Sequence, residues 1–247
     1  MNELSPWKNF YRKQYGGHWR RFSEDLAQQP YHVRYQDVCL ASVRKAKGRV
    51  LEVGAGRGDL LLKMPPDSAE LFGCDISGDN IAACADRLRR TGRPIHLCHA
   101  DAEQLPYGSD SFDAVYSLSV LWYLPDYRSA VREMFRVAKP GGLVLFDMYN
   151  AWHVTTLSNH LWRILCRLAG RELGRTKMAG VSSLANVVRP LAREYHIYGN
   201  YLLLPAGLPW LKEAGNLCRF APSMAYAMSE GPMRRLAHKL LVAATKR

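Results

Sequence analysis

The fold of this chain is decided by residues 50–60, which read VLEVGAGRGDL. A short apolar strand runs directly into a turn that carries glycine at positions 54, 56 and 58, and a helix-like stretch follows. Glycine tolerates positive φ and carries no Cβ, so a ligand lies directly against the backbone of such a turn. Strand, glycine turn and helix in this order predict a ligand site at the C-terminal end of the first strand of an α/β sheet.

The residues around the turn indicate which ligand it takes. The glycines follow the pattern G-x-G-x-G, whereas the dinucleotide pattern G-x-G-x-x-G needs glycine or alanine where this chain has Asp59. A carboxylate there repels a pyrophosphate. S-adenosylmethionine has no phosphate and carries a positive sulfonium and ammonium, so acidic neighbours such as Glu52 favour it over NAD or ATP. We expect S-adenosylmethionine as cofactor, the alternative being a glycine turn that serves only tight packing.

Two more acidic residues end the next two predicted strands. Asp75 follows Gly54 by 21 positions, close to the offset of about 20 at which a carboxylate meets ribose hydroxyls. Asp101 follows the third strand, where it is placed to accept from an adenine amino group, with the Ala102 backbone at the ring edge. Either acid alone is equally explained as a helix cap. At successive strand ends they together predict an adenosine site.

The alternation of strands and helices between residues 48 and 150 predicts βαβ units and a mostly parallel sheet, hence an α/β fold. The predicted strands are Arg49–Val53, Leu71–Asp75, Ile95–His99, Phe112–Leu118, Leu143–Asp147, Tyr195–Leu204 and Lys239–Ala244. The predicted helices are Asp59–Met64, Gly78–Arg90 and Tyr127–Ala138, after which Lys139-Pro140-Gly141-Gly142 turns the chain into the next strand.

Composition is that of a single globular domain, with 48% hydrophobic and 23% charged residues in 247. The first residues carry no apolar run for a signal peptide, and the apolar stretch Tyr201–Leu211 is broken by two prolines, so we expect neither export nor a membrane span. The six cysteines are scattered, which predicts reduced thiols in the cytoplasm and no metal site. The net charge of +12 is compatible with nucleic acid, anionic lipid or an acidic substrate.

Taken together, these motifs resemble the class I S-adenosylmethionine-dependent methyltransferases, in particular the branch with the ubiquinone and menaquinone methyltransferases. The resemblance rests on Glu52–Gly58, Asp75, Asp101–Pro106, Ser111–Val115 and Arg136–Gly142, in that order. It implies a Rossmann-like sheet of seven strands whose last strand, near Lys239–Lys246, runs antiparallel. It is good over about residues 48–150, weak over the last ten, and silent elsewhere.

The resemblance and the strand ends together give a predicted set of cofactor residues. Ser117 is expected beside the methionine part of the cofactor, and Tyr15, on a helical stripe with Tyr11 and Trp19, is expected to close over it or else to pack in the core. The full set is Glu52, Gly54, Ala55, Gly56, Gly58, Asp75, Ile76, Asp101, Ala102, Glu103, Ser117 and Tyr15.

Methyl transfer from a sulfonium is an in-line displacement, so alignment of the reactants is the main task of the enzyme. An oxygen acceptor also has to lose its proton, and His153 is the first candidate for a general base, with His160 seven residues further on. A surface or capping histidine is the alternative. Trp122 and Tyr123 are expected to wall the methyl site or to pack in the core.

We expect one methyltransferase domain, with an N-terminal helical cap (1–47), a cofactor-binding core (48–150), a variable acceptor-binding region with a helical cap insertion (151–233) and a final strand (234–247). The expected acceptor is a small hydrophobic or aromatic metabolite, methylated at oxygen, with carbon and nitrogen left open. Alternatives are a quinone or lipid-linked substrate at a membrane surface and, with less support, RNA. We expect a monomer or homodimer, and leave peripheral membrane contact open.

Overall fold

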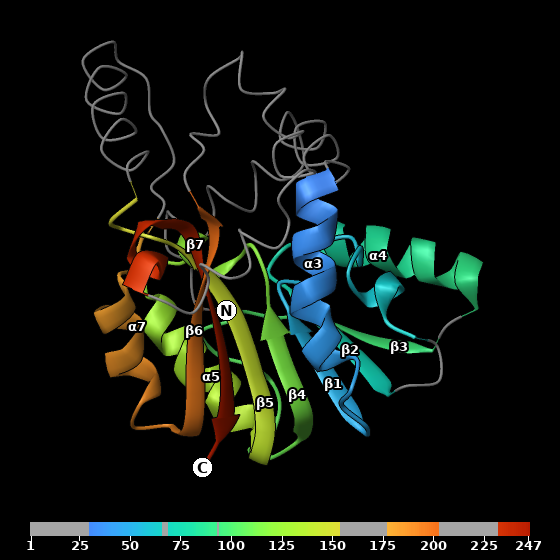
Figure 1. The fold of residues 1–247 in the computed structure, drawn as a ribbon. Coiled ribbons are helices and arrows are strands. Elements are labelled where there is room, and N and C mark those ends of the chain that lie inside the picture. The colour runs from blue at the N-terminus through green and yellow to red at the C-terminus, as the bar shows by residue number, and fades with distance from the viewer. Residues whose placement is uncertain (1–29, 66–68, 93, 154–176, 203–231) are drawn as a thin grey trace, which may run out of the picture.

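The computed structural model describes residues 30–65, 69–92, 94–153, 177–202 and 232–247. These residues form one seven-stranded sheet. Its strands are β1 (Arg49–Val53), β2 (Glu70–Asp75), β3 (Ile95–His99), β4 (Phe112–Ser117), β5 (Ala138–Tyr149), β6 (Ala192–Leu202) and β7 (Ala237–Lys246). Their order is β3-β2-β1-β4-β5-β7-β6 (Figure 1). β1 to β5 are parallel, and β7 is antiparallel to both β5 and β6, which confirms the predicted fold class.

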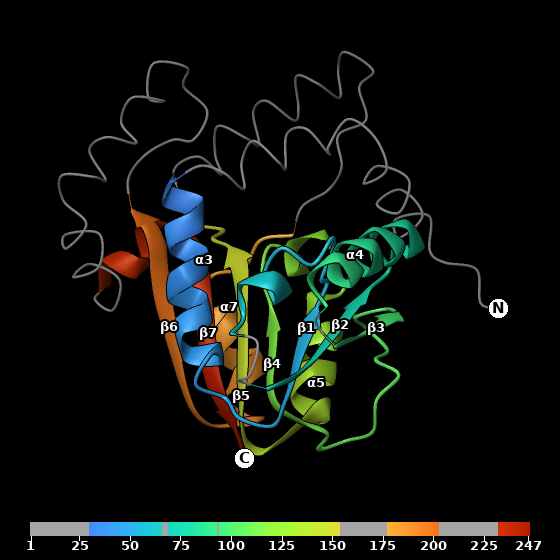
Figure 2. The ribbon, with the colours of Figure 1, turned by 90° about the vertical axis from the view of Figure 1, so that its right-hand side faces the viewer.

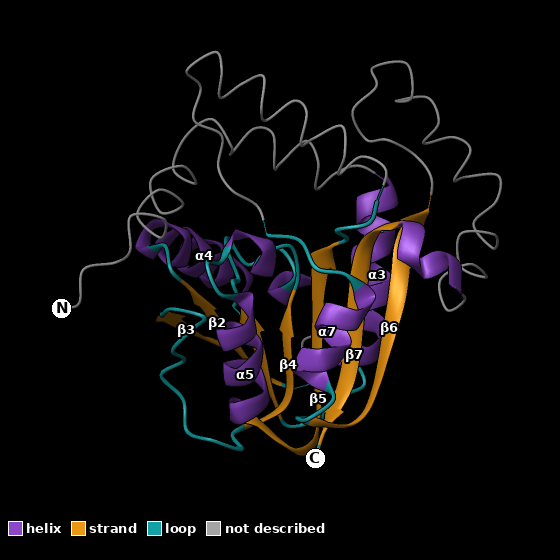
Figure 3. Ribbon diagram, turned by 90° about the vertical axis from the view of Figure 1, so that its left-hand side faces the viewer, coloured by secondary structure: helices purple, strands orange, loops and turns teal. Residues whose placement is uncertain are grey.

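Helices cover both faces of the sheet. α3 (Pro30–Val43) and α4 (Gly78–Thr91) pack on one face, and α5 (Tyr127–Val137) and α7 (Val181–Val188) on the other (Figures 2 and 3). α4 begins where Ser77 Oγ accepts from the Asn80 N–H, and it ends at Gly92, whose φ of +64° closes the helix. Both ends follow the local sequence.

The central strands are apolar on both faces because helices cover both. Along β1, Val50 packs with α3 and α4, whereas Leu51 and Val53 pack toward α5 and α7. All three are fully buried. Burial of a side chain of this size stabilises the fold by about 1.5–3 kcal/mol. The continuous apolar run in the sequence therefore reflects a two-sided core.

Most of the predicted elements occur in the described residues, with three differences. The predicted helix Asp59–Met64 is only a 3₁₀ turn, Leu61–Lys63. β5 begins at Ala138, because that residue pairs with Phe112 before the register shifts around the glycines. A helix, α7, precedes β6 within the region predicted as variable. The four-part division of the chain stays a prediction.

The topology brings several strand ends to one edge of the sheet. β1, β2, β4 and β5 all end there, and the reversed β7 starts there, with Lys239 opposite Tyr149. Within the described part of the chain no helix is long and apolar enough to cross a membrane. Four cysteines in that part, namely Cys39, Cys74, Cys84 and Cys98, are free thiols.

Candidate active site

The glycine turn has positive φ at all three glycines: +78° at Gly54, +53° at Gly56 and +79° at Gly58. The three differ in what a Cβ would meet. At Gly54 it would lie 2.4 Å from Val120 Cγ2, and at Gly58 2.5 Å from the Cys84 sulfur. At Gly56 it would meet no atom of the described residues within 4 Å. Gly54 and Gly58 are therefore required for packing inside the protein, whereas Gly56 faces the open space that a ligand needs.

The carboxylate of Asp75, at the end of β2, holds this turn. Its Oδ2 accepts from the Gly56 N–H at 2.9 Å, and its Oδ1 accepts from the Ser77 N–H at 2.8 Å and from Asn80 Nδ2 at 3.3 Å. Burial raises the pKa of Asp75 above its usual value, against the effect of these hydrogen bonds. A carboxylate oxygen accepts more than one hydrogen bond, so Asp75 retains acceptor capacity beside Gly56.

Glu52 and Asp59, the acidic residues from which the sequence predicted a cationic ligand, already have partners within the protein. Glu52 is only 2% exposed and its Oε2 accepts from the Tyr116 hydroxyl at 3.0 Å. Burial raises the pKa of Glu52 well above its usual range. Asp59 forms an ion pair with Arg87 at 2.6 Å. Charge therefore favours a cationic ligand less strongly than the sequence indicated.

The chain just after β3 forms a local turn. Asp101 Oδ1 accepts from the Glu103 N–H at 3.0 Å, which forms a local turn after β3. Ala102, between them, is buried. The Ile76 carbonyl lies 2.8 Å from His99 Nε2, which ties the ends of β2 and β3 together. The predicted adenine-side residues thus lie at the same edge as Asp75.

Three predicted cofactor residues differ from the others, because two are buried and one lies outside the described residues. Ala55 is buried, and its N–H donates to the Cys74 carbonyl at 2.8 Å. Ser117 is fully buried, and its hydroxyl donates to the Val53 carbonyl at 2.8 Å, which links β4 to β1. Its side chain therefore serves the sheet. Tyr15, like Tyr11 and Trp19, lies outside the described residues.

The predicted base His153 lies just beyond β5 and is 2% exposed. Its ring centroid is 5.1 Å from that of His238 on β7. Burial lowers the pKa of His153, so the neutral form needed for proton removal dominates near neutral pH. Burial, followed by the charges of His153 and Lys239, lowers the pKa of His238 to about 4. The second candidate, His160, lies outside the described residues.

Trp122 and Tyr123, which were predicted to wall the methyl site or to pack in the core, follow the end of β4. Trp122 is buried, and its ring centroid lies 5.7 Å from that of Tyr123 and 4.2 Å from that of Tyr149. Trp122 thus belongs to the core and also borders the end of β5. The structure supports the core interpretation of Trp122, and its role as a wall of the methyl site stays a prediction.

Sequence reasoning missed a buried polar cluster at this edge, which we call the Asp147 cluster: Tyr35, Ser119, Asp147 and Lys239. Asp147 is fully buried, and it accepts from the Tyr35 hydroxyl at 2.7 Å and from the Ser119 N–H at 2.6 Å. Lys239 Nζ lies 3.4 Å from Asp147 Oδ2 and 3.3 Å from Ser119 Oγ. It also lies 4.5 Å from the centroid of the Trp122 ring, as in a cation–π contact. The available signal was one charged residue in each of the two predicted apolar strands, Asp147 in Leu143–Asp147 and Lys239 in Lys239–Ala244.

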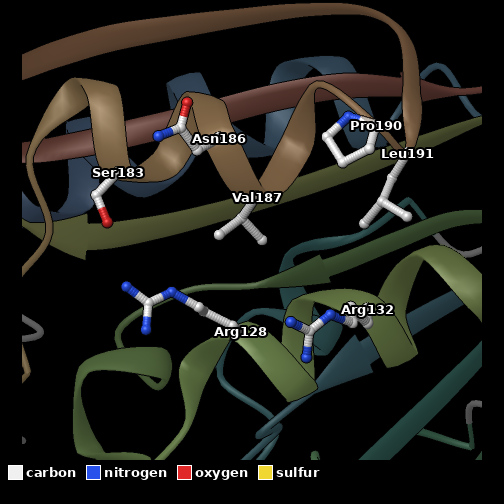
Figure 4. A pocket seen from close by; sticks show the side chains of 7 residues that line it. All are labelled: Arg128, Arg132, Ser183, Asn186, Val187, Pro190 and Leu191. Atoms are coloured by element: carbon white, nitrogen blue, oxygen red, sulfur yellow. The ribbon is translucent and has the colours of Figure 1, made fainter.

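A groove of about 300 Å³ lies elsewhere, between α5 and α7 (Figure 4). Arg128 and Arg132 line it from α5, opposite Ser183, Asn186 and Val187. It contains none of the predicted site residues, so the candidate site is identified by its strand ends and glycine turn. Among the described residues no cluster of His, Cys, Asp and Glu is suited to hold a metal ion.

Part of the chain is similar in sequence to known proteins. Residues 51–146 match the family model described as a methyltransferase domain. The chain is 37% identical over 102 residues to the ubiquinone/menaquinone biosynthesis C-methyltransferase of Vibrio campbellii, covering 39% of each. It is 32% identical over 126 residues to the demethylmenaquinone methyltransferase of Thermus thermophilus, covering 50% of each. The chain thus spans half or less of the length of these relatives.

Solved structures extend the likeness to the whole fold. A methyltransferase from Thermotoga maritima superposes with a TM-score of 0.67 over 98% of this chain and 100% of its own, at 14% identity. The N-methyltransferase NodS from Bradyrhizobium japonicum, solved with S-adenosylhomocysteine, gives 0.57 over 97% and 98%, at 18% identity. At these identities the likeness concerns the fold alone.

Proposed function

We propose that the chain is an S-adenosylmethionine-dependent methyltransferase, because residues 51–146 match the family model described as a methyltransferase domain, as the motifs predicted. The observation that carries the proposal is the pairing of Gly56 with Asp75. Gly56 faces open space, and its N–H is held by a carboxylate that retains acceptor capacity at the end of the neighbouring strand.

The residues present fit the cofactor. In this proposal Gly56 lets an adenosine lie against the turn, Asp75 accepts from the ribose hydroxyls, and the Asp101–Glu103 turn borders the adenine. When bound, S-adenosylmethionine supplies an electrophilic methyl group on a sulfonium. The chain's own contribution is to hold both reactants in line and to exclude water, through the buried ends of β4 and β5.

We further propose a small hydrophobic or aromatic acceptor, methylated at oxygen. The aromatic rings of Trp122, Tyr123 and Tyr149 beside the strand ends support a flat acceptor. His153, neutral because burial lowers its pKa, takes the acceptor proton in this proposal. A cytoplasmic location stays a prediction.

The first test is isothermal titration with S-adenosylhomocysteine. We expect micromolar binding by the wild type and its loss in Gly56→Arg and Asp75→Ala. Gly141→Arg is the matched control, because Gly141 also has positive φ (+76°) and no described residue lies within 4 Å of its Cβ position, yet it lies near the start of β5. Absence of binding by the wild type, or equal loss in Gly141→Arg, would contradict the proposal.

A second candidate is methylation of a quinol carbon, favoured by the two quinone methyltransferases among the relatives. Incubation with methyl-labelled cofactor and either demethylmenaquinol or a simple phenol separates the two. Mass spectrometric fragments that retain the label on the ring identify carbon transfer, and loss of the label as a methoxy fragment identifies oxygen transfer. Sedimentation with anionic vesicles at low and high salt tests whether the basic chain reaches a lipid-embedded acceptor.

A further inference from the structure

Ser119, just after β4, has a backbone conformation that needs support. Its φ is +64°, and it shares a positive φ with only one other non-glycine residue of the described part, Asp110. A Cβ makes this region costly, so such a residue persists only where its surroundings hold it. At Ser119 the holding contact is the 2.6 Å hydrogen bond from its N–H to Asp147 Oδ1.

Asp147 is itself fixed from two other elements. The Tyr35 hydroxyl of α3 donates to Oδ2 at 2.7 Å, and Lys239 Nζ of β7 lies 3.4 Å from the same oxygen. Both charged side chains are buried, with exposed fractions of 0% for Asp147 and 7% for Lys239. A buried carboxylate with this many fixed donors has one position, so it holds Ser119 rigidly.

The residue after Ser119 carries this restraint to the glycine turn. Val120 fills the space where a Cβ on Gly54 would lie, at 2.4 Å from Val120 Cγ2. On its other side the turn is tied to β2, because Gly54 and Ala55 both donate to the Cys74 carbonyl at 2.8 Å. The turn is therefore enclosed between β2 and Val120, and a shift of Ser119 displaces one wall.

We propose that Asp147 is a positioning residue for the cofactor turn: anchored by Tyr35 and Lys239, it keeps Ser119 left-handed and thereby keeps Val120 against Gly54. Asp147 touches no cofactor in this account. The inference rests on the proposed function only for the identity of the ligand. It makes α3 and β7, far from the glycine motif in sequence, part of the cofactor site.

The test first removes the hydrogen bond that holds Ser119, and then replaces Ser119 by a residue that does not need it. Asp147→Leu/Lys239→Met eliminates both charges together, so that no single buried charge is left without its partner. We expect this variant to bind S-adenosylhomocysteine about tenfold more weakly than wild type, which corresponds to about 1.4 kcal/mol. Adding Ser119→Gly should restore the affinity, because glycine adopts positive φ without the carboxylate. Adding Asp110→Gly, at the other left-handed residue, should not.

A second readout needs no ligand. Backbone hydrogen exchange of residues 54–58 and 119–121 should accelerate in the double variant and slow again with Ser119→Gly. Unchanged affinity and exchange in the double variant would overturn the proposal, as would equal rescue by Ser119→Gly and Asp110→Gly. If the wild type fails to bind S-adenosylhomocysteine while the exchange pattern holds, the proposed function fails and the positioning role of Asp147 stands.

Discussion

The two halves of the functional edge are assembled in different ways. On the cofactor half, the contact that defines the site joins Gly56 to Asp75, which are 19 residues apart. On the other half, at the ends of β4 and β5 and the start of β7, the contacts of the Asp147 cluster join residues 112, 92 and 120 positions apart. The first half is encoded in two consecutive strands, β1 and β2, and the second depends on the completed seven-stranded sheet.

This difference explains how one half is recognisable from sequence and the other is not. Within one βαβ unit, spacing alone places the glycine turn beside the next strand end. For α3, β5 and β7, spacing carries no such information, because the topology of the sheet, with its reversed strand β7, determines which of their residues are in contact. Experiments that separate local from long-range dependence therefore test the comparison directly.

The largest effect is expected for Lys239→Met, which leaves Asp147 charged and buried without its cation. Removal of one partner of a buried pair costs about 3–5 kcal/mol of unfolding free energy. The matched control is Lys139→Met, because Lys139 pairs with Asp113 at the partly exposed end of β5. That change should cost about 1 kcal/mol or less. Urea unfolding measures both, and equal losses would remove the distinction between the two pairs.

The next effect is expected for Gly54→Ala, which links the halves. The new Cβ meets Val120 and also demands positive φ from alanine, so we expect a loss of about 2–4 kcal/mol. Gly141→Ala, at φ +76° with open space, isolates the conformational part at about 1–2 kcal/mol. Adding Val120→Ala to Gly54→Ala should recover stability by relieving the overlap. Failure of that recovery in thermal unfolding would show that the two halves are not in contact through these residues.

Much of the fold was predictable for a simple reason. β1 and β3 have the predicted bounds. For β1 the reason is that an apolar run bounded by turns leaves little choice for a strand buried on both faces. The helix expected at Asp59–Met64 is only a 3₁₀ turn, since that stretch is too short for a helix of several turns to form between the glycines and Pro65.

The candidate site was predictable only in part. Gly56 and Asp75 are together, as their spacing predicted. The predicted roles of Glu52 and Ser117 did not anticipate that both side chains are buried. Glu52 accepts from the Tyr116 hydroxyl, and Ser117 donates to the Val53 carbonyl. Neither contact has a sequence signature, because both join β1 to β4, 64 residues away.

A smaller effect on stability is expected from a change in pH, through the buried pair His153 and His238. Burial and neighbouring charge lower the pKa of His238 in the folded state to about 4 from its usual 6.5. The unfolded chain therefore takes up the proton first as pH falls, so stability is complete above 6.5 and declines as pH falls toward 4, by at most about 3 kcal/mol. His238→Phe keeps the ring packing against Tyr149 and should flatten this slope in urea unfolding between pH 7 and 4. An unchanged slope would assign it to another group.

The smallest effect is expected on the cofactor half, at Glu133. The Arg136 guanidinium lowers the pKa of Glu133, whose Oε2 also accepts from the Leu105 N–H at 2.9 Å and so holds the loop after Asp101. Stabilisation by this carboxylate is complete above its ordinary pKa of 4.5 and is lost as pH falls through the lowered value. Glu133→Gln keeps an oxygen for Leu105, so it should cost about 1 kcal/mol or less near pH 7.

Glu133→Gln should therefore leave S-adenosylhomocysteine affinity within a factor of about two, the equivalent of about 0.4 kcal/mol. Glu133 and Arg136 are one helical turn apart on α5. Glu133 is 28 positions from Leu105, so this support of the loop spans a shorter stretch of sequence than the contacts of the Asp147 cluster. If titration instead shows a larger loss of affinity in Glu133→Gln than in Asp147→Leu/Lys239→Met, the cofactor turn depends more on its own half of the edge than on the long-range cluster. The comparison would then be reversed, with the buried charges of β5 and β7 serving the fold rather than the site.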